Sequence, residues 1–71
     1  MTKKCKVILR VPGAWEKSVE VDCGKSVGDV LREQGLLPNE YIASMDGRVV
    51  TEDVRIERDT VLTLYPVVSG G

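Results

Sequence analysis

The sequence predicts a single α+β domain in which one short helix packs across a sheet of four to five strands. Three observations predict it: two neighbouring runs that alternate hydrophobic and polar residues, a capped stretch with helical spacing, and further β-rich runs after it. The chain has 71 residues, 42% hydrophobic and 30% charged, which is typical of one globular domain. We expect the domain to cover residues 1–66 and a flexible tail to cover residues 67–71.

The first two strands are predicted at residues 5–11 and 18–22. Both runs alternate, so each has a hydrophobic face and a polar face. The Pro-Gly pair between them predicts a turn. A hairpin centred on Ala14 would pair Leu9 with Val19, and the two hydrophobic faces would then coincide.

The same register would place Cys5 opposite Cys23. Directly opposed strand residues have Cβ atoms ~4.5–5.5 Å apart, whereas a disulfide needs ~3.8 Å. Cytosolic thiols are also normally reduced. We therefore expect two small buried hydrophobic residues, with a redox or conjugation role as the alternative. Two cysteines in a chain without histidine fall short of a zinc or iron–sulfur site.

A short helix is predicted to begin at Ser26 and to stop at Gly35. Ser26 is a good N-cap, and Asp29 three residues later can complete a capping box. One helical face is hydrophobic and consists of Val27, Val30 and Leu31. Gly28 is unexpected inside the helix, because glycine there costs up to ~1 kcal/mol relative to alanine.

The remaining strands are predicted from composition and turn chemistry. Residues 41–45 form a third strand, the Asp46-Gly47 pair forms a tight turn, and residues 48–50 return. Residues 60–65 form a last β-rich strand, which ends before a proline because proline cannot donate to a ladder.

The sequence closes on Val67-Val68-Ser69-Gly70-Gly71. Two glycines have no side chain to pack or ligate, but they can enter a narrow slot that any Cβ would block. A carboxylate delivered through such a slot can attack the α-phosphate of ATP and become an acyl-adenylate. Loose termini are common, so this ending acquires its meaning from the domain before it.

Composition argues against several classes of function. Ten basic and eleven acidic residues give a net charge of −1, so we expect no direct nucleic-acid partner. No apolar run approaches the ~20 residues of a membrane span, and we expect a cytoplasmic protein. The absence of histidine removes the commonest catalytic base and metal ligand. We therefore expect no metal site and no enzyme.

The order of elements, together with four segments, resembles the ubiquitin-like β-grasp family over essentially the whole chain. Within that family the chain is similar to the sulfur carriers: the thiamin-pathway carrier, the small subunit of molybdopterin synthase, and the ubiquitin-related and archaeal small modifier proteins. The segments that carry the likeness are Ser26–Leu31, Met45–Arg48, Arg58–Leu64 and Tyr65–Gly71. The Pro-Val-Val-Ser-Gly-Gly run is closest to molybdopterin synthase small subunits, and the Asp-Gly-Arg turn to thiamin-type carriers and archaeal modifiers.

The resemblance implies a mixed sheet and a protein that is a substrate of other enzymes. A ubiquitin-activating-type adenylyltransferase would use ATP and magnesium to adenylate Gly71, and persulfide sulfur would convert it to a thiocarboxylate. Val68, Ser69 and Gly70 would enter the partner's active site, and the chain itself would bind no cofactor. The sulfur would serve thiamin or molybdopterin biosynthesis or tRNA thiolation.

Other outcomes stay open. The same glycine could instead be joined to lysines of target proteins, and the chain could be a binding module that is never activated, or a redox protein. The resemblance also places the last strand beside the first and third, so that their helix-distal faces form a partner-docking surface. That surface would hold Ile8, Ile42, Ser44, Tyr65 and Val67. Scattered surface hydrophobic residues are the alternative reading.

Overall fold

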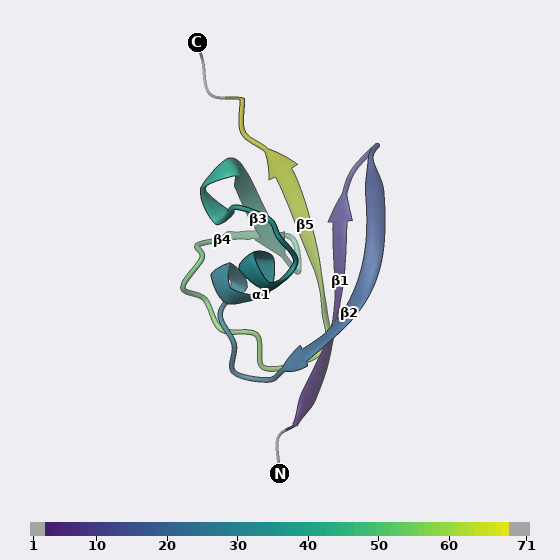
Figure 1. Cartoon of the computed structure of the whole chain (residues 1–71), viewed down its shortest axis with the longest axis vertical. Helices are drawn as coiled ribbons and strands as arrows, with labels where there is room; N and C mark the ends of the chain where they lie inside the picture. Colours follow the sequence, from purple (N-terminus) through teal and green to yellow (C-terminus); the bar gives the residue numbers. More distant parts are fainter. Residues whose placement is uncertain (1–2, 69–71) are drawn as a thin grey trace.

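The computed structural model describes residues 3–68, which form a five-stranded mixed sheet with one helix across one face (Figure 1). The strands are β1 (Lys4–Val11), β2 (Trp15–Asp22), β3 (Tyr41–Met45), β4 (Arg48–Val50) and β5 (Thr60–Pro66). The helix α1 spans Val27–Glu33, and a 3₁₀ turn, η1, spans Pro38–Glu40. This architecture confirms the predicted α+β fold class.

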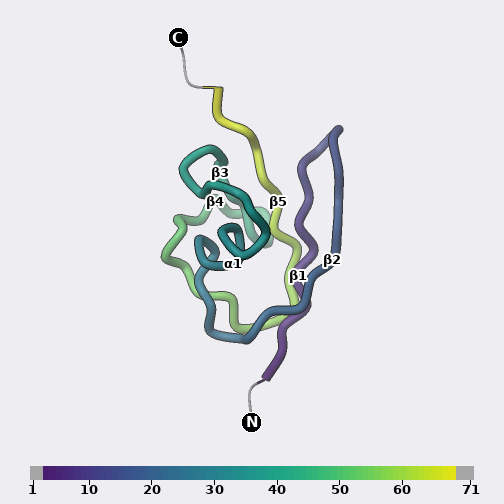
Figure 2. The backbone as a smooth tube through the Cα atoms, viewed as in Figure 1, coloured from purple at the N-terminus to yellow at the C-terminus, as the bar shows by residue number. Residues whose placement is uncertain are grey.

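The sheet has the strand order β2-β1-β5-β3-β4. The central neighbours β1 and β5 are parallel, and the other pairs are antiparallel. The backbone trace in Figure 2 shows these two strands running side by side in one direction. As a consequence, β5 leaves the sheet at the end of the molecule opposite to the one where β1 begins (Figure 1).

The register of the β1–β2 hairpin differs from the prediction by two residues. Leu9 pairs with Lys17 and not with Val19, because the turn is centred on Gly13 and not on Ala14. The Ala14 amide donates to the carbonyl three residues earlier at 3.0 Å, and Gly13 has φ 78°, as a type II turn requires. A shift of two residues keeps every side chain on its face, so alternation alone cannot detect it.

The expectation for the cysteines is wrong: Cys5 and Cys23 form a disulfide. In the observed register Cys5 faces Val21, and Cys23 lies one residue beyond the end of β2. The two Cα atoms are 5.2 Å apart, within the ~4.4–6.8 Å range that a disulfide accepts. The two cysteines are not directly opposed, so the Cβ separation that argued against a disulfide does not apply to them. The bond joins the start of β1 to the end of β2.

The helix begins as predicted, and its first amides are all paired within the chain. Ser26 Oγ accepts from the Asp29 amide at 3.1 Å, which confirms the N-cap. The amides of Val27 and Gly28 donate to carbonyls of the segment 51–59, at 2.8 Å each. The usual unpaired donors of a helix start are thus satisfied. The helix stays attached to the segment that leads into β5.

The core lies between the sheet and α1. The strands contribute their inward residues, α1 its hydrophobic face, and the segment 51–59 contributes Ile56. The largest fully buried side chains are those of Leu9, Leu31, Ile56, Leu62 and Leu64. Within residues 3–68, no helix has the length and hydropathy needed to cross a bilayer.

Candidate functional site

Strand β5 sets the direction in which the C-terminal residues leave the domain. It lies between β1 and β3, and Pro66 is its last residue. The Val67 amide then donates to the Glu40 carbonyl at 2.8 Å. Val68 is 88% exposed. The predicted tail therefore starts at the surface, beside η1, and the body holds its backbone as far as Val67.

The reach of the tail follows from chain geometry. An extended residue spans at most ~3.3–3.6 Å, so Gly71 lies at most roughly 13–14 Å from Val67. Ser69, Gly70 and Gly71 lie outside the described residues. Any partner that acts on Gly71 must therefore approach close to the end of β5.

The helix-distal face of the sheet gathers four of the five predicted docking residues. Ile42 pairs with Tyr65, and both are 48% exposed. Ser44 pairs with Thr63 on the same face, two residues further along each strand. Ile8 of β1 pairs with Val61 of β5. Since directly paired residues project to the same side of a sheet, these residues share one surface.

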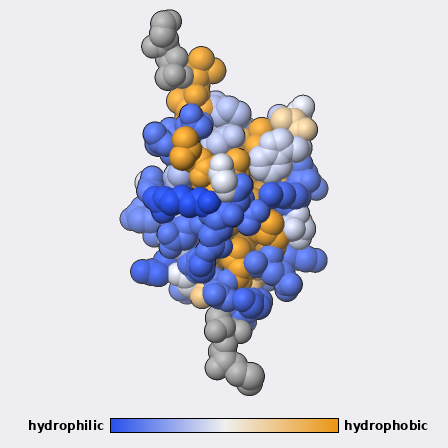
Figure 3. Space-filling model, in the orientation of Figure 1, coloured by the Kyte–Doolittle hydropathy of each residue, from blue (hydrophilic) through white to orange (hydrophobic). Residues whose placement is uncertain are grey.

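The fifth predicted residue, Val67, follows β5 by one residue and is 46% exposed. It connects this face to the point where the tail leaves. In Figure 3 hydrophobic residues lie directly next to the grey C-terminal residues. The structure thus shows where the predicted residues lie, whereas their role in docking stays a prediction.

Two hydrophobic residues of this face were missed from the sequence. Val61 pairs with Ile8, and Val49 of β4 pairs with Ser44, so both project from the helix-distal side. Both are exposed. Strict alternation from Tyr65 through Thr63 already places Val61 on this face, and that signal was available. We call the five predicted residues together with Val49 and Val61 the distal patch.

Charged residues border the distal patch on β1 and β2. Lys4 forms an ion pair with Asp22, and Arg10 lies 3.9 Å from Glu16. The hydrogen bond from the Lys4 ammonium holds the pKa of Asp22 below its ordinary value. These pairs are exposed and each contributes little stability. They restrict the apolar part of this face to β3, β4, β5 and the middle of β1.

Within residues 3–68, no three cysteine or carboxylate side chains are placed to hold a metal ion. Cys5 and Cys23 are joined in the disulfide, so neither is a free thiol. The candidate site therefore consists of the distal patch and the exit of the tail next to it.

Fold and site together define a ubiquitin-like protein of the β-grasp class. A model of the family "small archaeal modifier protein 2" matches residues 5–65. The chain belongs to this family. The match covers β1 through nearly all of β5, so it includes the sheet, the helix and most of the distal patch.

Solved structures agree on the fold. A Caldiarchaeum subterraneum ubiquitin superposes with a TM-score of 0.75 at 18% identity, covering 97% of this chain and all (100%) of that chain. A Haloferax volcanii protein solved in solution gives 0.74 at 19% identity, with 96% and 88% covered. A ubiquitin-like protein from Trypanosoma brucei gives 0.64 at 19% identity, with 90% and 95% covered. At these identities the likeness concerns the fold alone.

Proposed function

We propose that this modifier is activated at the carboxyl group of Gly71 by a ubiquitin-activating-type adenylyltransferase. The Gly71 carboxylate attacks the α-phosphorus of ATP, with magnesium supplied at the partner's site, and pyrophosphate leaves. A nucleophile then attacks the acyl-adenylate, and AMP leaves. The observation that carries this proposal is the family match, together with a β5 that ends beside the exposed Val68.

The product depends on which nucleophile attacks the acyl-adenylate. Sulfide yields a thiocarboxylate directly. A persulfide instead yields an acyl disulfide, from which a thiol of the partner releases the thiocarboxylate as that thiol forms a disulfide with the sulfur donor. The thiocarboxylate is a soft nucleophile that donates sulfur to a thiamin or molybdopterin precursor or to an activated tRNA base. The amine of a lysine yields an isopeptide bond to a target protein instead. Membership in a family of small modifiers supports the second product. Both products need the same activated Gly71.

In this mechanism the chain contributes recognition and access. The distal patch docks on the adenylyltransferase, and Val68, Ser69 and Gly70 enter its active site behind Gly71. Glycine at position 70 keeps this passage narrow, because a Cβ there would widen the chain. We assign no catalytic residue to the chain, and we expect the reaction to take place in the cytoplasm.

The test is an extension of the C-terminus by one alanine. Extension should abolish pyrophosphate exchange by the cognate adenylyltransferase, because the reacting carboxylate moves beyond the active site. The same alanine added before Met1 is the matched control and should leave exchange unchanged. Full activity of the C-terminally extended chain would contradict the proposal.

Intact mass separates the two products. After incubation with enzyme, ATP and sulfide, a mass gain equal to the exchange of one oxygen for one sulfur identifies the thiocarboxylate. Target proteins that carry residues 59–71 of the modifier on a lysine after digestion with trypsin, which cleaves after Arg58, identify the modifier role. If neither species forms although pyrophosphate exchange occurs, both products are wrong and only the activation step stands.

A further inference from the structure

A groove lies on the helix side of the sheet, away from the distal patch. It has a volume of about 280 Å³ and is lined by Trp15, Glu16, Lys17, Gln34 and Leu36. The register explains its position. Trp15 and Lys17 pair with the buried Val11 and Leu9, so they face the helix side, and α1 ends at Glu33 before it covers them.

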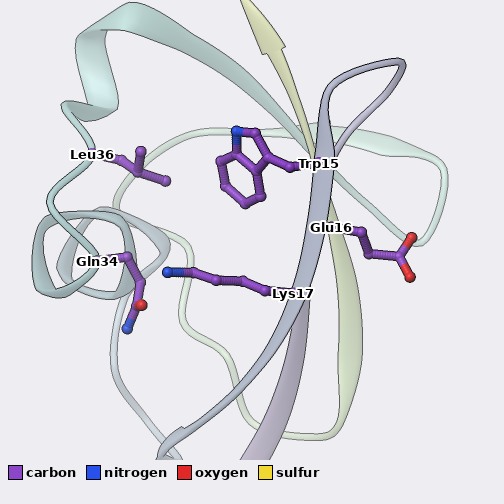
Figure 4. A pocket seen from close by; sticks show the side chains of 5 residues that line it. All are labelled: Trp15, Glu16, Lys17, Gln34 and Leu36. Carbon is purple, nitrogen blue, oxygen red and sulfur yellow. The ribbon is translucent and has the colours of Figure 1, made fainter.

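The groove has an apolar end and a cationic end. Figure 4 shows the Trp15 indole turned towards Leu36, the Lys17 chain reaching towards Gln34, and Glu16 turned away from both. Glu16 lies instead 3.9 Å from Arg10. The Lys17 ammonium is 6.0 Å from the Trp15 ring centroid. Among residues 3–68 Lys17 takes part in none of the ion pairs, so the groove presents a positive charge.

The groove borders an edge strand. β2 is an outer strand of the sheet, and within the described chain it pairs only with β1. It is eight residues long, whereas the opposite edge strand β4 has three. An edge strand presents backbone N–H and C=O groups that an extended peptide can pair with, and an adjacent pocket then selects side chains.

We infer that the edge of β2 and this groove bind an extended segment of a partner protein, which adds to the sheet as a further strand. Side chains on one face of a strand recur every second residue, at ~6.5–7 Å. Trp15 and Lys17 have this spacing. The segment therefore carries an apolar residue for the space between Trp15 and Leu36, and an acidic residue two positions away for Lys17. The charge of Lys17 is what selects an acidic segment.

This interaction does not depend on Gly71. It takes place on the opposite face from the distal patch and needs neither ATP nor an activated carboxyl group. Partner proteins could thus recognise the modifier non-covalently, and the failure of the inference would be distinguishable from the failure of the activation chemistry.

The test uses the full chain and two synthetic peptides, acetyl-Thr-Leu-Thr-Glu-Thr-Thr-amide and acetyl-Thr-Thr-Glu-Thr-Leu-Thr-amide. The first presents Leu and Glu in the order required by parallel addition to β2, and the second in the order required by antiparallel addition. Trp15 is the only tryptophan and is 37% exposed, so its fluorescence reports binding directly. We expect one of the two peptides to shift this emission saturably. We also expect it to protect β2 amides from hydrogen exchange.

Lys17→Glu should weaken binding of that peptide about fivefold or more, because it replaces an attraction by a repulsion of similar size. Arg48→Glu makes the same change of charge at the other edge of the sheet and should leave binding unchanged. A peptide N-methylated at every second amide, on the edge that faces β2, should not bind. If N-methylation has no effect, the peptide does not add as a strand, and the inference is overturned.

Three further outcomes would also overturn it. One is equal binding by Lys17→Glu and the unaltered protein. Another is perturbation of the distal patch by the peptide, in place of Trp15 and β2. The third is concentration-dependent dimerisation that buries Trp15 without peptide, since a second copy would then occupy the groove.

Discussion

Tyr65 lies both in the distal patch and next to the point where the C-terminal tail leaves the sheet. It lies in the distal patch, pairs with Ile42 and precedes the last residue of β5. Its half-exposed ring can bury more surface on a partner, and aromatic residues are frequent anchors of interfaces. Its loss should therefore affect docking more than folding.

We predict that Tyr65→Asp lowers the rate of adenylation roughly tenfold at limiting modifier concentration, because an anchoring aromatic contributes ~1–2 kcal/mol or more to binding. The free energy of unfolding should change by less than ~0.5 kcal/mol, as is usual for surface positions. Pyrophosphate exchange and urea denaturation measure the two effects. Leu37→Asp, on an exposed residue outside the distal patch, is the control. An unchanged exchange rate would remove Tyr65 from the interface.

Gly28 shows why a residue that is unfavourable in a helix can be required there. A Cβ at this position would lie 3.1 Å from the Glu52 Cβ and 3.2 Å from the Glu52 carbonyl oxygen. That carbonyl also accepts the Gly28 amide at 2.8 Å, so it cannot retreat without loss of the bond. The sequence indicated the cost of this glycine, but the close approach of residues 51–59 depends on tertiary structure.

We predict that Gly28→Ala destabilises the domain by about 1 kcal/mol. The gain of up to ~1 kcal/mol in helix propensity is outweighed by ~1–3 kcal/mol of overpacking. The midpoint of urea denaturation measures this. In the Gly28→Ala background, Glu52→Gly removes one of the close contacts and should recover part of the loss. A rise in stability on Gly28→Ala alone would mean that the segment 51–59 can move away from the new Cβ at little cost in free energy.

At the scale of elements, the β1–β2 hairpin shows what alternation can and cannot predict. The two strands, their faces and the turn were predicted, because hydrophobic residues recur with period two on both sides of a Pro-Gly pair. The register could not be predicted from alternation, since a shift of two residues leaves every side chain on the same face. The positive φ of Gly13 was the missing information, and the error over Cys5 and Cys23 followed from it.

We predict that reduction of the Cys5–Cys23 disulfide lowers the free energy of unfolding by about 3 kcal/mol, the value expected for a closed loop of this length. The sequence separation is 18. Guanidinium denaturation with and without reductant measures the change. The double variant Cys5→Ala/Cys23→Ala should be insensitive to reductant. Two free thiols, alkylated at lysis before exposure to air, would show that the bond is absent in the cell.

At the scale of the whole molecule, the absence of histidine determines the response to pH. Hydrogen bonds from Lys4 to Asp22 and from Thr51 to Asp53 lower the pKa of both carboxyl groups. Their contribution is present above the unfolded pKa, ~3.9, and is lost as the pH falls through the folded values. The hydrogen bond to Glu33 raises the pKa of Lys25. The stability that this bond contributes is therefore lost only in alkali, as the pH rises through the pKa of Lys25 in the folded protein.

We therefore predict a flat stability profile between about pH 5 and pH 9, with a shallow decline below about pH 4. Asp53 is exposed, and Asp22 and Lys25 are only half-buried, so solvent weakens these interactions and the decline should be small. Thermal denaturation at a series of pH values measures the profile. Lys4→Met should bring the pKa of Asp22 closer to its ordinary value in an NMR titration. A stability maximum or a steep step near neutral pH would contradict this account.

The fold of the whole chain could be predicted because its signals are local and agree with one another. Ser26 caps the helix, Asp46-Gly47 turns β3 into β4, and the last β-rich run becomes β5. Four of the docking residues share a face because period-two alternation determines which side of a strand each occupies. The groove beside β2 was not predictable, because it depends on where α1 stops relative to the strand. That distance comes from packing and is absent from any local pattern.

The central position of β5 also has a mechanical consequence. A pull applied through the C-terminal residues acts along β5, which is hydrogen-bonded to β1 on one side and β3 on the other. Such a load shears both ladders at once, whereas an edge strand could be peeled away one bond at a time. A protein fastened to its target at this end would therefore resist forced extraction better than its small size suggests.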